Sequence, residues 1–332
     1  MRLPLLAQLA PSPLREPLAA WRMATPGRVA VAYSGGADST ALLVEQARAI
    51  AAGGSPPLLA LHVHHGLQPA ADGFVAHAQA FCEALNLQLP TRLSVTRVQV
   101  PLPPRASVEA QARNARYDAL AAMAREYGMD TVLLAQHADD QAETLLIALG
   151  RGAGVAGMAG MAPGFLHQGV HFARPLLEVA APAIRRWLTD AGIPWVEDPS
   201  NADQRHTRNR LRQRLMPALE EALPEFRPTF ARCARLAHTA QSLLEELASE
   251  DLARIGDPPS IDALRGLSAA RAANVLRHWL RMRHGTIGSE AQMQALIAVI
   301  QACTTRGHDV HIKVGLGHVE RDGERLAYRP FL

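Results

Sequence analysis

The segment between residues 29 and 39 constrains the fold of this chain more than any other. An apolar run of β type ends at the string Ser-Gly-Gly-Ala-Asp-Ser, residues 34–39, and apolar residues at helical spacing follow it. These signals predict a strand, a tight turn and the start of a helix. Two glycines let backbone N–H groups approach an oxyanion, because no Cβ stands in the way. A helix N-terminus behind them carries partial positive charge, so the string predicts a phosphate site.

The polar residues of this string suit both phosphate and a metal ion. Ser34 and Ser39 offer hydroxyl donors, and Asp38 offers a hard oxygen ligand of the kind that holds Mg²⁺ against phosphates. A plain strand-to-helix turn, with Asp38 or Ser39 as the helix N-cap, is the alternative interpretation. The complete string after an apolar strand favours the phosphate site.

Two common nucleotide-binding motifs are excluded. A Walker loop needs Gly-Lys-Ser/Thr, and the only lysine of the chain is Lys313. A dinucleotide fingerprint needs Gly-x-Gly-x-x-Gly and an acidic residue after the second strand, and neither is present. The string resembles instead the signature of the PP-loop ATP pyrophosphatases, which cleave ATP between its α- and β-phosphates.

Length and composition indicate a globular chain of about two domains. The 332 residues are 48% apolar, and a net charge of +3 is compatible with nucleic-acid binding without requiring it. Three scattered cysteines lack the spacing of a redox or metal motif, and no disulfide framework is expected. Prolines interrupt the first twenty residues, and no run approaches the roughly 20 apolar residues of a membrane span. We therefore expect a cytoplasmic protein with no membrane partner.

Strand and helix signals alternate through the first half of the chain, which predicts an α/β fold with a doubly wound parallel sheet. A leader element is expected over residues 1–25, a catalytic domain over 26–216, and a smaller, mostly helical domain with a short C-terminal hairpin over 217–332. The expected strands are 28–33, 58–64, 88–95 and 131–135. The main expected helices are 38–52, 72–86, 107–127, 139–149, 181–191, 208–223, 230–250, 269–283 and 290–302.

A second polar cluster follows the expected strand at 131–135. His137 precedes a helix on which Asp140 and Glu143, three residues apart, share a face, as do Asp139 and Glu143, four apart. Ligands of such sheets bind beyond the carboxyl ends of the strands, so these carboxylates should face the glycine string and could bind an ammonium group or a metal. Acidic residues in a first helical turn can also merely complement the helix dipole. His137 by itself is more typical of a surface or internally satisfied histidine.

Several segments together resemble the bacterial tRNA(Ile)-lysidine synthases. Each is weak alone, but their joint order over residues 29–217 is specific. The segments are His62–Leu67, Glu109–Tyr117, Gln136–Met161, Arg174–Leu177, Trp195–Asn201 and Arg208–Arg212. His64 stands where the family usually has Asn, and Gln68 where it usually has a basic residue. The chain stops short of the longer members, so we expect a short form without the further C-terminal domain.

The resemblance implies an ATP- and Mg²⁺-dependent ligase. ATP would adenylate oxygen 2 of the wobble cytidine in an isoleucine tRNA with a CAU anticodon. Free L-lysine would then displace AMP at carbon 2 and give lysidine, which changes codon reading from AUG to AUA. A PP-loop tRNA thiolase and a non-catalytic nucleotide- or RNA-binding relative are the alternatives. No cysteine lies near a strand end that carries a motif, which disfavours the thiolase.

The resemblance also implies roles for individual residues, and it leaves a homodimer open. The ATP-binding set is Ser34, Gly35, Gly36, Ala37, Asp38, Ser39, His65 and Arg151. The catalytic set is Asp38, Asp140, Glu143 and Arg113, with Asp38 as the Mg²⁺ ligand and Asp140 holding lysine or metal. The tRNA-binding set is Arg205, Arg208, Asn209 and Arg212, a basic stretch that suits an unpaired anticodon loop.

Overall fold

The computed structural model describes most of the chain, in two compact units. The described residues are 1–25, 27–52, 57–64, 66, 71–99, 108–199, 203–305 and 308–331. The units are Met1–Leu236 and Ala237–Leu332. The boundary expected from the sequence, after residue 216, falls twenty residues before this division. The physical reason is that Met216 and Phe226 share a small buried cluster with Ala142 of the first unit.

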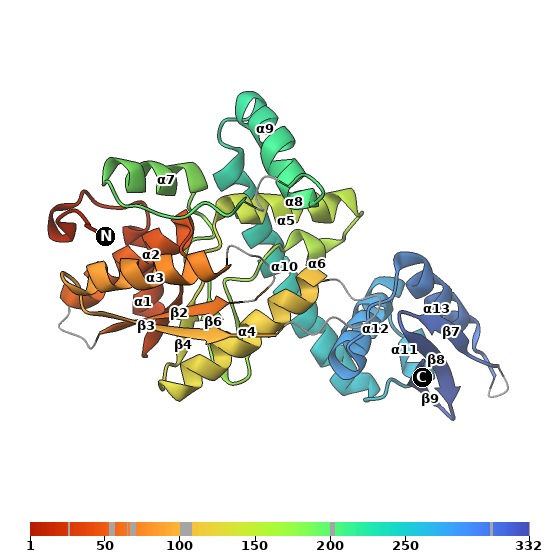
Figure 1. The fold of residues 1–332 in the computed structure, drawn as a ribbon. Coiled ribbons are helices and arrows are strands. Elements are labelled where there is room, and N and C mark those ends of the chain that lie inside the picture. Colours follow the sequence, from red (N-terminus) through yellow and green to blue (C-terminus); the bar gives the residue numbers. More distant parts are fainter. Residues whose placement is uncertain are drawn as a thin grey trace. The chain divides into compact units, whose positions relative to one another are not determined.

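A six-stranded sheet forms the centre of the first unit (Figure 1). Its strand order is β3-β2-β1-β4-β6-β5, and every neighbouring pair is parallel except β5 with β6. The strands are β1 (Val29–Ala32), β2 (Leu58–His64), β3 (Thr91–Arg97), β4 (Thr131–Leu133), β5 (Gly164–His167) and β6 (Val170–Ala173). The predicted doubly wound sheet is therefore confirmed.

Both faces of this sheet are covered, because successive side chains of a strand point to opposite faces. In β1, Val31 packs into a cluster with residues of α2, α3 and α7, whereas Ala30 packs with residues of α4. Burial on both sides explains why the central strands are continuously apolar. The helical elements of this unit are η1 (Leu6–Gln8), α1 (Arg15–Ala24), α2 (Ala37–Ala52), α3 (Ala71–Asn86), α4 (Val108–Glu126), α5 (Ala138–Gly150), α6 (Val155–Met158), α7 (Ala181–Asp190), α8 (Thr207–Arg210), the π-helical η3 (Leu211–Leu215) and α9 (Met216–Ala222).

Strands β5 and β6 were not expected from the sequence. They form a hairpin in which His167 pairs with Val170 around the two-residue turn Gln168-Gly169. Both turn residues have positive φ, 47° and 80°, as tight hairpin turns of the primed types require. β6 then lies parallel to β4 and extends the sheet beyond the four predicted strands.

The second unit packs helices against a small antiparallel sheet of order β7-β8-β9. The predicted hairpin near Asp322 and Gly323 joins β8 to β9, and β7 adds a strand that the sequence did not indicate. The elements are α10 (Phe226–Ile255), which begins in the first unit, α11 (Ile261–Arg265), α12 (Ala269–His284), α13 (Glu290–Ala302), β7 (His311–Val314), β8 (Gly317–Asp322) and β9 (Arg325–Pro330). No helix in the described part of the chain is both long and apolar enough to cross a membrane.

Candidate functional site

The glycine loop between β1 and α2 is held in one shape by its own hydrogen bonds. Gly35 has a φ of +88°, a region that residues with a Cβ avoid, and its carbonyl accepts a bond of 2.9 Å from the Val196 N–H. The Ser34 N–H donates to Ser39 Oγ at 3.2 Å, and Ser39 Oγ donates to the Gly36 carbonyl at 3.0 Å. The loop is therefore a firm turn at the start of α2, as a phosphate site requires.

A cavity of about 540 Å³ opens beside this loop, at the carboxyl ends of β1, β2 and β4. It collects side chains from both polar clusters and from the basic stretch near residue 210. The expected site residues that line it are Ser34, Gly36, Ala37, Asp38, Ser39, Arg113, Asp140, Arg208 and Arg212. Three separate predictions from the sequence thus converge on one cavity.

Other expected residues lie elsewhere. Arg151 caps the far end of α5, eleven residues or roughly 16 Å along the helix from Asp140, and is exposed. Arg205 is largely exposed and pairs with Asp203 at 2.7 Å. Asn209 is buried and donates to the Asp203 carbonyl at 2.8 Å, which ties the loop to α8. The structure brings none of these three to the cavity wall.

Two of the positions singled out from the sequence, His65 and Gln68, lie outside the residues that the structure describes. His64, the departure from the family pattern, is buried at the end of β2 and has Nε2 3.3 Å from Asp72 Oδ1. It lines the cavity beside the glycine loop.

His137 is neither a surface residue nor an isolated one. It is buried at the N-cap of α5, with Nε2 3.4 Å from Asp38 Oδ2 and 3.5 Å from Asp140 Oδ2. Burial alone would lower the pKa of His137, but the carboxylates of Asp140 and Asp38 outweigh it and raise the pKa to about 9. The two carboxylates therefore favour the protonated ring, and His137 joins the glycine loop to the second polar cluster.

Asp38 has the features of a metal ligand. Its Oδ1 is buried and has no hydrogen-bond partner within the described chain. Burial tends to raise the pKa of Asp38, but the bond from His137 and nearby cations lower it below its ordinary value, so the carboxylate is ionised. Among the described residues no group of three or more His, Cys, Asp or Glu could hold a metal. A Mg²⁺ ion at Asp38 would therefore take its remaining ligands from phosphates and water, which is its usual mode of binding.

Arg212 bridges the two carboxylates of the second cluster. Its Nη2 lies 2.9 Å from Asp140 Oδ1 and 3.2 Å from Glu143 Oε2, and its Nε also donates to Glu143. Glu143 is fully buried behind the cavity wall. Burial raises the pKa of Glu143, and the Arg212 guanidinium offsets only part of this rise.

Asp139 points away from the cavity, although the helical spacing allowed it to join Glu143. Its Oδ1 accepts from Arg227 Nε at 2.6 Å, and its Oδ2 accepts from the Ala181 N–H at 2.8 Å. Arg227 also pairs with Glu220. Asp139 therefore anchors α5 to α7 and to the start of α10.

Three further arginines near the cavity had no role assigned to them from the sequence. Arg116 lines it beside Arg113, and their guanidinium carbons lie 5.7 and 5.5 Å from the Tyr117 ring centroid. The spacing of three residues between them places both on one helix face, so this pair was open to prediction. Arg185 of α7 also lines the cavity, and Arg174 donates to the lining residue Gln136 at 3.1 Å. Their positions depend on tertiary packing.

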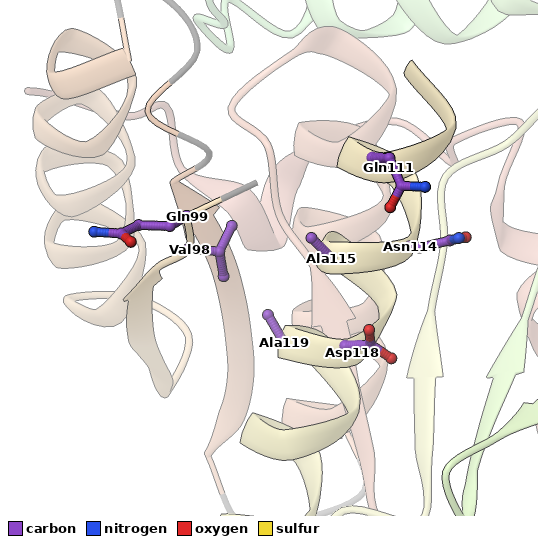
Figure 2. A pocket seen from close by; sticks show the side chains of 7 residues that line it. All are labelled: Val98, Gln99, Gln111, Asn114, Ala115, Asp118 and Ala119. Carbon is purple, nitrogen blue, oxygen red and sulfur yellow. The ribbon is translucent and has the colours of Figure 1, made fainter. Parts of the chain in front are cut away.

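A second hollow, of about 480 Å³, lies between the end of β3 and α4. Figure 2 shows Ala115 and Ala119 projecting from α4 toward Val98, while Asn114 points away. Its one carboxylate, Asp118, is exposed and paired with His167 at 2.8 Å. The described residues around this hollow include no nucleophile, cation or phosphate cradle, so we assign the functional site to the cavity beside the glycine loop.

The chain matches known protein families and curated proteins. Residues 12–219 match a family described as the PP-loop domain, and residues 260–326 match the TilS substrate binding domain. A tRNA(Ile)-lysidine synthase of Polaromonas naphthalenivorans (strain CJ2) is 50% identical over 298 residues, which cover 90% of this chain and 88% of that protein. One from Burkholderia pseudomallei (strain K96243) is 43% identical, over 82% of this chain and 56% of that protein.

Among solved structures, the U34-tRNA thiolase NcsA of Methanococcus maripaludis shares the fold. The TM-score is 0.56 with 16% sequence identity, over 68% of this chain and 77% of that chain. At this identity the likeness concerns the fold alone.

Proposed function

This chain belongs to the tRNA(Ile)-lysidine synthases, and from that membership and the cavity we propose how its residues share the reaction. It is an ATP-dependent ligase of the PP-loop family that forms lysidine in tRNA(Ile). The thiolase alternative is not favoured. Cys82 and Cys303 are buried, Cys233 is exposed, and none of the three lines the cavity.

The proposed reaction has two steps. Oxygen 2 of the wobble cytidine attacks the α-phosphorus of ATP, and pyrophosphate leaves with the electrons of the broken bond. The ε-amine of free lysine then attacks carbon 2, AMP leaves with oxygen 2, and the amine loses a proton. Both steps depend mainly on positioning and on stabilisation of charge.

The glycine loop supports the first step. The backbone of Gly36, the hydroxyls of Ser34 and Ser39 and the N-terminus of α2 would hold the pyrophosphate part of ATP. Asp38 would hold Mg²⁺, because its Oδ1 is buried and unpartnered in the described chain. When bound, Mg²⁺ neutralises charge on the phosphates.

The carboxylates support the second step. Asp140 lines the cavity and would hold the lysine ammonium, with Glu143 directly behind it; both carboxylates are bonded to Arg212 in this structure. Arg113 and Arg208 add cations at the wall, suited to the adenylate and to RNA phosphates. Arg205 would contact the tRNA outside the cavity. Since ATP and tRNA are cytoplasmic, we place the enzyme there.

The convergence of Asp38, Asp140 and the glycine loop on one cavity carries the proposal. The test is incorporation of labelled lysine into unmodified isoleucine tRNA with a CAU anticodon, with ATP and Mg²⁺. We expect incorporation to require the wobble cytidine and to be lost in Asp38→Asn and Asp140→Asn. Asp118→Asn, an exposed carboxylate of the second hollow, is the matched control and should be active. A folded Asp140→Asn protein with normal activity would contradict the assignment.

A further inference from the structure

Arg212 occupies the position at which the proposed reaction would bind the lysine ammonium. Its guanidinium contacts Asp140 Oδ1 at 2.9 Å and Glu143 Oε2 at 3.2 Å, with a further bond from Nε to Glu143. A lysine ammonium that entered this position would have to replace those bonds. In this structure both carboxylates therefore already have a cationic partner from the protein itself.

The segment that carries Arg212 has an irregular helical backbone. It is the π-helical η3, in which the Met216 N–H donates to the Leu211 carbonyl five residues back. π-helical turns are rare and are frequent at functional sites. A return to α-helical pairing would turn a residue of the segment by about 100° relative to its flanking helices. Arg212 can thus be withdrawn by a local change in backbone pairing.

An RNA phosphate has access to this arginine. The Arg212 side chain is 39% exposed, and Arg208 lines the same cavity one helical turn earlier in the chain. A guanidinium binds phosphate through two parallel bonds at least as well as it binds a carboxylate. A phosphate of the anticodon loop can therefore compete with Asp140 and Glu143 for Arg212.

We propose that Arg212 occupies the lysine ammonium site of the free enzyme and leaves it when a phosphate of the tRNA anticodon loop binds the guanidinium. The inference rests on the proposed function and adds a regulation of the same site. Lysine and tRNA then bind cooperatively, because each favours the arrangement in which Arg212 is withdrawn. By linkage the coupling is reciprocal: lysine tightens tRNA binding by the factor by which tRNA tightens lysine binding.

The first test measures lysine affinity by calorimetry, without tRNA or ATP, for wild type, Arg212→Gln and Arg214→Gln. Arg214 lies on the same π-helical segment but bonds to Gln204 at 2.7 Å, so it is the matched control. If the carboxylates are free in about a tenth of wild-type molecules, removal of Arg212 tightens lysine binding about tenfold. Arg214→Gln should leave it unchanged. Unchanged or weaker binding by a folded Arg212→Gln protein would overturn the inference.

The second test needs no variant. Lysine affinity of the wild type is measured with and without an anticodon stem-loop RNA bearing CAU, and the RNA should tighten it about tenfold. Equal affinities would overturn the inference even if Arg212→Gln failed to fold. The incorporation assay separates this outcome from failure of the function: an enzyme that makes lysidine but shows no coupling lacks only the proposed regulation.

Discussion

Replacement of Arg227 by alanine tests how α5, with the carboxylates proposed to be catalytic, is held in place. Arg227 and Asp139 form a pair in which the side chains are 13% and 10% exposed, with Nε 2.6 Å from Oδ1. Removing one partner of a buried pair costs about 3–5 kcal/mol, because the other charge is left without compensation. Asp139 keeps its bond from the Ala181 N–H and lies 3.8 Å from His137 Nδ1, so we expect the lower end, about 3 kcal/mol.

The matched control lies on the same helix. Arg235 of α10 pairs with Glu178 at 3.0 Å, but these side chains are 58% and 62% exposed. An exposed ion pair contributes less than about 1 kcal/mol to the free energy of unfolding, so Arg235→Ala should change that free energy little. For a unit as large as Met1–Leu236, about 3 kcal/mol corresponds to a fall in Tm of roughly 6–12 °C.

The assay is thermal unfolding of the wild type, both single variants, and the double variant of Asp139→Asn with Arg227→Ala. The double variant should recover part of the Tm lost in Arg227→Ala, because the neutral asparagine replaces the buried carboxylate that has no arginine partner. Equal melting temperatures for Arg227→Ala and Arg235→Ala would refute the reasoning. So would a double variant that is no more stable than Arg227→Ala alone.

Three other perturbations probe separate parts of the molecule. Gly35→Ala forces a residue with a Cβ to a φ of +88°, which should cost about 1–2 kcal/mol and weaken binding of an ATP analogue; wild-type affinity would contradict this. Trp279→Ala leaves a cavity in the core of the second unit and should lower its free energy of unfolding, measured in urea, by about 3–5 kcal/mol. A decrease below about 1 kcal/mol would contradict the packing. Bonds from Arg271 hold the pKa of the buried Asp251 below its ordinary value. The ionised Asp251 therefore stabilises the fold above pH ~4, and this stabilisation is lost as the pH falls through the lowered pKa. The exchange rate of backbone amides in α10 and α12, divided by the intrinsic rate at each pH, should therefore rise as the pH is lowered from 5 to 3. Asp251→Asn should make this ratio less dependent on pH.

Local chemistry was enough to predict most elements and two parts of the site. The strand predicted at 58–64 and the helix predicted at 290–302 have the same bounds in the structure. Apolar periodicity and glycine placement are short-range signals, so a strand, a turn and a helix can be recognised without knowledge of their neighbours. The same reasoning placed Asp38 and Asp140 at strand ends, and the structure brings both to one cavity.

The sequence by itself therefore determined the α/β class, the glycine loop between a strand and a helix, and the family, because these depend on local patterns and their order along the chain. Only the tertiary structure decided which partner each charged side chain meets. Asp139 and Asp140 are adjacent in sequence but about 100° apart on the helix, so one binds Arg227 and the other lines the cavity. Arg212, expected to bind tRNA, contacts Asp140 and Glu143, some seventy residues earlier in the chain. Periodicity defines the faces of a helix, but packing determines what each face contacts.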